Sequence, residues 1–245
     1  MLCSGYFVGF VNAHSTCLRV IRNLKSFPKP PSFKNVKYPP KEAGENNELP
    51  EVGKFPVFNA ELNEEPTVTT KRLIELRGPE LVHHNFVHEQ YGIVALKGGM
   101  MKHNDFEMAR AYINPNLTKK MFAIWRVDPP WLPRTKLSQG SKMSAAKGRL
   151  HHYATPVRER RVILEVGGDL TYMEALRLLN PVAHKLPFPA RMYSHLELMD
   201  ERELEQKTCE LNVNPFTWEF VMKWNMQNCS HWLSPYDYEW GTKYR

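Results

Sequence analysis

Hydrophobic and polar positions follow two different periods between residues 91 and 127. Apolar residues alternate through 91–99, which predicts a strand that stops at two glycines. From about 104 to 114 they recur at helical spacing, so we expect an amphipathic helix that ends before Pro115. Aromatic and β-branched residues dominate 121–127 and predict a second strand.

Prolines then interrupt the pattern before two more strand-like segments. Three prolines within 129–133 break the preceding strand and open a long loop that runs to Gly148. Beyond this loop, 149–157 and 161–167 have the composition of strands and flank the charged sequence RERR. We expect these two segments to form an antiparallel pair across that turn.

Helical signals return in the last third of the chain. Thr171 and Glu174 have the spacing of a capping box, which predicts a helix toward Lys185 with a kink at Pro181. A strand is expected from 187 to 195. Beyond it the sequence favours an acid-rich helix, a second short helix and an aromatic end of the chain.

This order of elements predicts an α+β fold. We expect a small antiparallel or mixed sheet with two helices and a long basic loop, plus extended N- and C-terminal arms. The composition indicates four parts: a targeting presequence at 1–29, an extended linker or arm at 30–70, a compact core at 71–195 and a C-terminal extension at 196–245.

The first part has the composition of a mitochondrial presequence. It contains apolar residues, hydroxyl residues and arginines, and no acid precedes Glu42. A secretory signal is the alternative, but its positive charge precedes the apolar stretch, whereas here Arg19, Arg22 and Lys25 follow it. No apolar run in the sequence approaches the ~18–20 residues that a membrane-spanning helix needs.

Positive charge is concentrated in the middle of the chain. Residues 119–161 contain eleven Lys or Arg and two acids, so their net charge of +9 exceeds the +7 of the whole chain. A surface that is merely solvated usually mixes both signs, whereas a one-sided excess within a folded core is typical of nucleic-acid binding. Trp125, Trp131 and Tyr153 lie in the same segment and could stack on bases or support the contact.

Patterns for catalysis or metal binding are weak. The loop 140–148 lacks the glycine and hydroxyl positions of a phosphate-binding loop, and Asp105 and Glu107 face apart on a helix. Adjacent residues of a strand point to opposite faces, so His151 and His152 are not expected to chelate one ion. Contact with phosphate or plain exposure suits them better. We therefore expect no cofactor, no metal and no catalytic centre.

Several motifs occur in the order found in one known family. MFAIWRV, KMSAAKGRLHHYATPV, RVILEVGG, EALRLL and AHKLPF together resemble the bacterial large-subunit ribosomal protein sixteen family over about 91–193. The flanking sequences IELRGPE, NPFTW and LSPYD resemble the mitochondrial branch of that family and extend the likeness over about 71–245.

The resemblance implies a structural protein of the mitochondrial large ribosomal subunit, in the matrix, with no enzymatic activity. Its implied partners are the mitochondrial large-subunit ribosomal RNA (rRNA), the A-site tRNA near the peptidyl-transferase region and neighbouring mitochondrial ribosomal proteins. The residues expected to bind rRNA are Lys119, Lys120, Arg126, Arg134, Lys136, Arg149, His151, His152, Arg158, Arg160, Arg161 and Lys185. The loop expected to face tRNA consists of Gln139, Gly140, Ser141, Lys142, Met143, Ser144, Lys147 and Gly148.

This loop is also where the sequence departs from the family pattern. Lys142 stands where the family has an arginine, and a lysine cannot make the bidentate or stacked contacts of a guanidinium group. Ser144, Ala145 and Ala146 replace glycine, lysine and glycine. The loop therefore has less charge and less backbone freedom than the family pattern.

Two other functions remain open from the sequence. One is a non-ribosomal RNA-binding assembly factor that uses the same basic segment. The other is an RNA-modifying enzyme of the mitochondrial matrix, which requires a convergent acid and base set that the sequence does not show.

Overall fold

The computed structural model describes residues 32–40, 47–56, 75–140, 148–241 and 244. It contains two antiparallel sheets and several helices, so the predicted α+β class is confirmed. All features discussed below belong to one compact unit, Asn35–Arg245.

The first sheet has four strands in the order β3-β6-β1-β7. They are β1 (Tyr91–Ala95), β3 (Met121–Trp125), β6 (Val162–Gly168) and β7 (Ala190–Ser194), and every neighbouring pair is antiparallel. All seven residues of β6 are buried. β6 is therefore the central strand around which the main core is built.

The second sheet has three strands in the order β2-β5-β4. They are β2 (Gly99–Lys102), β4 (Leu132–Lys136) and β5 (Arg149–Val157). β5 is the longest strand, and its two neighbours contact different parts of it: β2 pairs with its C-terminal half and β4 mainly with its N-terminal half.

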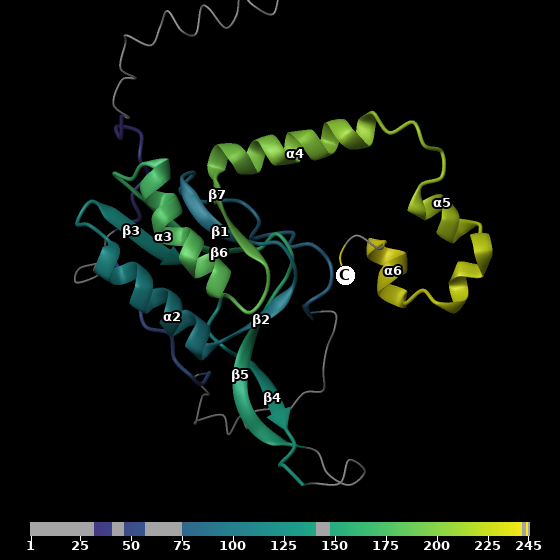
Figure 1. Ribbon diagram of the computed structural model, residues 1–245, viewed down its shortest axis with the longest axis horizontal. Helices are drawn as coiled ribbons and strands as arrows, with labels where there is room; N and C mark the ends of the chain where they lie inside the picture. The colour runs from purple at the N-terminus through teal and green to yellow at the C-terminus, as the bar shows by residue number, and fades with distance from the viewer. Residues whose placement is uncertain (1–31, 41–46, 57–74, 141–147, 242–243, 245) are drawn as a thin grey trace, which may run out of the picture. The chain divides into compact units, whose positions relative to one another are not determined.

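Two helices cover one face of the first sheet (Figure 1). They are α2 (His103–Ile113), followed by the short 3-10 helix η3 (Asn114–Asn116), and α3 (Tyr172–Lys185). The predicted capping box begins α3, since the backbone N–H of Thr171 donates to a carboxylate oxygen of Glu174. The helix runs to Lys185 as expected, with Pro181 in its interior.

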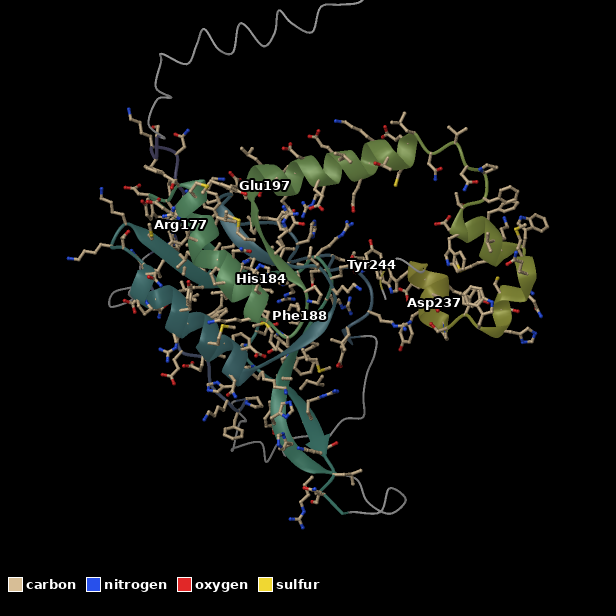
Figure 2. All side chains as sticks on the ribbon, in the orientation of Figure 1. Arg177, His184, Phe188, Glu197, Asp237 and Tyr244 are labelled. Carbon is tan, nitrogen blue, oxygen red and sulfur yellow. The ribbon has the colours of Figure 1, made fainter. Side chains whose placement is uncertain are left out.

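The described chain after β7 is mainly helical. It comprises α4 (His195–Glu210), α5 (Trp218–Lys223), the 3-10 helix η4 (Met226–His231) and α6 (Pro235–Trp240). Figure 2 shows Glu197 in the first turn of α4, where its carboxylate accepts a hydrogen bond from the backbone N–H of Ser194. No helix among the described residues is both long and apolar enough to cross a membrane.

The expected pairing of 149–157 with 161–167 is wrong. β5 pairs with β2 and β4, whereas β6 pairs with β1 and β3, so the turn between them joins two different sheets. Arg160 has a positive φ of 67° in this turn, and its N–H donates to the carbonyl of Ala95 at 2.7 Å. This hydrogen bond to β1 fixes the turn, through which the chain passes from the second sheet to the first.

Two strands lie where the sequence did not indicate them. β2 starts at Gly99, one of the two glycines at which the first strand was expected to stop. β4 contains Pro133, within the expected proline-rich loop. A proline is compatible with this position because β4 is an edge strand of its sheet, where a backbone N–H need not enter the ladder.

Part of the expected N-terminal arm packs on the core of its own chain. Leu49 is 2 % exposed, and its N–H donates to the side-chain oxygen of Asn114 at 3.0 Å. The N–H of Ala123 on β3 donates to the carbonyl of Asn47, also at 3.0 Å. Residues near 47–52 therefore extend the hydrogen bonding of β3 at the edge of the first sheet.

Candidate nucleic-acid interface

The N-terminal half of β5 and its partner β4 form a two-stranded ribbon. We call residues 132–136 and 149–152 the basic ribbon. β2 pairs with β5 only from Ala154 to Val157, so β4 is the sole neighbour of residues 149–152 among the described strands. Residues 149–151 are exposed, whereas the following part of β5 is largely buried. Figure 1 shows the ribbon where β4 and β5 run side by side.

Basic residues lie opposite each other across the ribbon. Lys136 pairs with Arg149, and Arg134 pairs with His152. Within the described part of the chain, neither Lys136, Arg149 nor Arg134 forms an ion pair with a carboxylate. Cross-strand pairs of like charge destabilise a sheet, and a bound anion relieves that repulsion. The ribbon therefore has the electrostatics of a polyanion-binding surface.

A bulge in β5 brings the two histidines together. The register shifts between Arg134 and Thr135, which pair with His152 and Leu150, so His151 has no partner across the strand. The Nδ1 atoms of His151 and His152 lie 2.8 Å apart, and the two rings meet edge to face. The expectation that they point to opposite faces is wrong, because an extra residue breaks the alternation of a strand.

The histidine pair is suited to hydrogen bonding rather than to carrying two charges. Partial burial lowers the pKa of His152 below its ordinary value of 6.5, and the nearby charges of Lys102, His151 and Arg134 lower it further. His152 is thus mainly neutral at pH 7. Among the described residues, no group of three His, Cys, Asp or Glu side chains could hold a metal ion. Lys102, on β2, is a neighbour of this site that sequence analysis missed, since β2 itself was not expected.

Only part of the expected tRNA-facing loop is described. Gln139 and Gly140 are exposed at its start, and Gly148 lies at its end. A Cβ atom at Gly148 would lie 2.7 Å from the carbonyl carbon of Lys136, so this position needs a glycine for the two strand ends to approach. The other expected loop residues lie outside the described residues: Ser141, Lys142, Met143, Ser144 and Lys147.

The arginines after β5 are engaged within the protein. Arg160 contacts Glu205 of α4 at 2.6 Å, and Arg161 contacts Glu80 at 3.3 Å. Burial opposes the charge of Arg160, but its hydrogen bond to Glu205 and the charge of that carboxylate raise its pKa overall. Arg158, the third expected cation of this turn, is half-buried and has interactions of its own. Two of the three expected phosphate ligands here are therefore compensated by carboxylates.

Arg126 neutralises a buried carboxylate. Its Nε lies 3.0 Å from Oε1 of Glu165, whose side chain on β6 is 1 % exposed. The backbone N–H groups of Val87 and His88 donate to the same carboxylate at 3.0–3.1 Å. This ionic latch, formed by Arg126, Glu165 and the two backbone N–H groups, fastens the loop before β1 to the centre of the first sheet.

The remaining expected cations lie in different surroundings. Lys119 and Lys120 are exposed in the turn before β3, and Lys120 lies 3.4 Å from a carboxylate oxygen of Asp169. Lys185, at the end of α3, lies over the ring of Tyr112 at 5.4 Å. These lysines remain accessible, but they are not part of the basic ribbon.

The aromatic residues also divide by role. Trp125 donates from Nε1 to the carbonyl of Pro50 and packs on Phe106, and Tyr153 is 4 % exposed. Trp131, immediately before β4, is 44 % exposed. Trp131 is thus the one of the three expected aromatics with a substantial free surface for stacking.

An exposed basic ribbon on a compact α+β body is typical of proteins that bind RNA. The family model described as ribosomal protein L16p/L10e matches residues 65–193, a range that includes both sheets except the last residue of β7. The large ribosomal subunit protein uL16 of Agathobacter rectalis is 33% identical over 111 residues, which cover 44% of this chain and 74% of that protein. The chain belongs to the ribosomal protein L16p/L10e family, so the resemblance of the motifs within 91–193 to that family is confirmed. Residues 194–245 lie outside the matched region.

Proposed function

We propose that this chain is a structural constituent of the large ribosomal subunit and binds rRNA through the basic ribbon. The observation that carries the proposal is the pairing of basic residues across the ribbon, Lys136 with Arg149 and Arg134 with His152, at its largely exposed end. Membership of the L16p/L10e family supports the ribosomal setting. Contacts to phosphate supply most of the affinity, and the fit of the ribbon to folded RNA supplies selectivity.

The cations contribute unequally to this function. Arg134, Lys136 and Arg149 are available to phosphate, whereas Arg126, Arg160 and Arg161 serve mainly to hold the fold, because each already faces a carboxylate. Lys119, Lys120 and Lys185 add further positive charge outside the ribbon.

The finer assignment is a mitochondrial ribosomal protein at the A-site side of the peptidyl-transferase region. The acid-free, arginine-containing composition of residues 1–29 supports import into the matrix. The segment 139–148 lies in the chain between the two strands of the ribbon, which supports a tRNA-facing role beside the rRNA contact. Neighbouring mitochondrial ribosomal proteins complete the expected set of partners.

Sedimentation tests the ribosomal assignment. The tagged full chain is expected to enter mitochondria and to co-migrate with the large mitochondrial subunit after a high-salt wash. Recovery only in light fractions would refute a ribosomal constituent and favour a free assembly factor. Recovery outside mitochondria, but on a ribosome, would refute the mitochondrial assignment alone.

Charge removal tests the basic ribbon. In binding to a large-subunit rRNA fragment, replacing Arg134, Lys136 and Arg149 with glutamine is expected to reduce the slope of log affinity against log salt by about 2–3, since each phosphate contact contributes roughly 0.7–0.9. The matched control replaces three exposed lysines outside the ribbon: Lys54, Lys97 and Lys223. Equal losses in both variants would show that affinity follows net charge and that the ribbon is not the site.

A further inference from the structure

The C-terminal segment exposes aromatic side chains that its own fold does not bury. Phe216, Phe220 and Trp224 are 57 %, 40 % and 65 % exposed. Their ring centroids are spaced 5.9 Å and 6.1 Å apart, so the three rings form a continuous row along α5. We call this row the aromatic ridge. Contiguous apolar surface of this kind on a folded chain marks an interaction site.

The spacing of the ridge suits insertion into a groove. Its residues are four apart in sequence, so they lie on one side of α5 and its two ends. Thr217 caps α5 by accepting a hydrogen bond from the N–H of Phe220, which fixes the start of the helix directly beside the ridge. Large aromatic side chains lose little conformational entropy on binding and dominate the energetics of protein interfaces.

The ridge is carried by a folded support. Cys229 of η4 is 1 % exposed, and Trp218 packs on Trp232 with ring centroids 5.7 Å apart. Asp237, labelled on α6 in Figure 2, is 3 % exposed, and its carboxylate accepts hydrogen bonds from the N–H and the hydroxyl of Ser234.

The same support is attached to the rest of the chain through α6. Arg77 donates to the hydroxyl oxygen of Ser234 at 3.1 Å and lies 3.9 Å from Asp237. The ring of Trp240 lies so close to Gly78 that a Cβ atom there would come within 2.8 Å of it. The intramolecular contacts thus use α6 and leave the aromatic ridge of α5 exposed.

Charge identifies the kind of partner. Residues 195–245 contain nine acidic and five basic side chains, a net charge of −4, and six of the acids lie on α4. Stacking of aromatic side chains on single-stranded RNA works together with a positively charged groove that follows the backbone, which this segment lacks. A segment with this charge repels a polyanion and attracts a basic protein surface.

We propose that the aromatic ridge docks into an apolar groove, bordered by Lys and Arg, on a neighbouring protein of the large ribosomal subunit. This inference rests on the proposed ribosomal function. The basic ribbon and the ridge then face different partners: the ribbon binds RNA, and the ridge binds protein. Residues 194–245 lie outside the family match, so the docking surface is an addition to the family core.

Photo-crosslinking from position 224 tests this proposal. The full chain with benzoylphenylalanine in place of Trp224 is assembled into the large subunit, isolated by sedimentation and irradiated. A protease-sensitive adduct whose crosslinked peptide combines apolar residues with Lys or Arg supports the ridge. An RNase-sensitive adduct, an acidic partner peptide, or no adduct in a correctly sedimenting subunit would overturn it. Failure to sediment with the subunit would instead refute the proposed function.

A pair of variants separates docking from folding. Replacing Phe216 and Phe220 with serine in the crosslinker chain is expected to lower the adduct yield about tenfold, the effect of losing one strong interface contact, while the chain still enters the subunit. The matched control replaces exposed apolar residues of the core, Leu81 and Val82, which are 64 % and 73 % exposed. An undiminished yield in the ridge variant would contradict the proposal.

Discussion

The ionic latch predicts a large effect from one nearly isosteric change. In Glu165→Gln the side chain keeps its shape but loses its charge, so the Arg126 guanidinium loses its only carboxylate within the described residues. The new amide group also directs N–H donors toward either Arg126 or the N–H groups of Val87 and His88. Both arrangements place donors against donors, and at least one group in the buried site is left unsatisfied.

The size of the effect follows from burial. Breaking a buried ion pair by removing one partner costs about 3–5 kcal/mol. The Arg126 side chain is 23% exposed and can recover part of its hydration. We therefore expect the free energy of unfolding to fall by about 3 kcal/mol, toward the lower end of that range. Arg126→Met, which keeps an aliphatic side chain, is expected to be less harmful when combined with Glu165→Gln than alone, with a coupling energy of about 1–2 kcal/mol.

Denaturant unfolding of the full chain measures these differences. Hydrogen exchange supplies a local measurement, because the amide protons of Val87 and His88 should lose protection in Glu165→Gln. The control is Glu107→Gln, which removes a partly exposed helical ion pair with Arg110 and should change stability little. If Glu165→Gln left both the free energy of unfolding and the two amide protons unchanged, the latch would not hold the fold as described.

Three further perturbations have distinct expected results. Replacing Lys142 and Lys147 with alanine should impair translation more than incorporation into the subunit, and a failure of incorporation would contradict a tRNA-facing loop. Burial raises the pKa of Glu80, but hydrogen bonds from His83 and Val82 and the charge of Arg161 lower this pKa overall below the ordinary 4.5. The ionised Glu80 carboxylate therefore contributes its full stabilisation above pH 4.5. This stabilisation is lost as the pH falls through the lower pKa of the folded state. Unfolding measured against pH should consequently be flatter in Glu80→Gln than in the parent chain. Gly168→Ala should lower the free energy of unfolding by more than about 2 kcal/mol, because φ at this position is +112° and a Cβ atom would meet the Lys120 carbonyl; an unchanged denaturation midpoint would refute this.

Local signals in the sequence predicted much of the fold. The alternation at 91–95, the helical period before Ile113 and the capping box at Thr171 each depend on nearby residues, and each corresponds to an observed element. Strand pairing depends on distant residues instead. The sequence between β5 and β6 resembles a hairpin turn. In the structure, however, Arg160 and Arg161 of this turn form backbone hydrogen bonds with Ala95 of β1, and the two strands belong to different sheets.

The candidate site was only partly predictable for the same reason. The excess of positive charge in 119–161 is visible in the sequence, yet the carboxylates that lie closest to Arg126, Arg160 and Arg161 are distant along the chain. They belong to Glu165, Glu205 and Glu80, which are 39, 45 and 81 residues away. The nearest in sequence of these, Glu165, shows no sign of being a partner of Arg126 until the strands are aligned. The contact between His151 and His152 likewise requires a bulge, and bulges depend on the register of the opposite strand.

Arg160 lies within the region that the family model matches, whereas its partner Glu205 lies in the C-terminal segment outside that region. Arg202 of the same helix donates to the carbonyl of His84, so two adjacent turns of α4 are fastened to the core. A chain shortened after Ser194 would lose the Glu205 carboxylate and uncover the Arg160 guanidinium. Such a chain would present a more basic surface and would bind polyanions with less discrimination. α4 thus supplies the counterion of Arg160, and this restricts RNA binding to other parts of the protein surface.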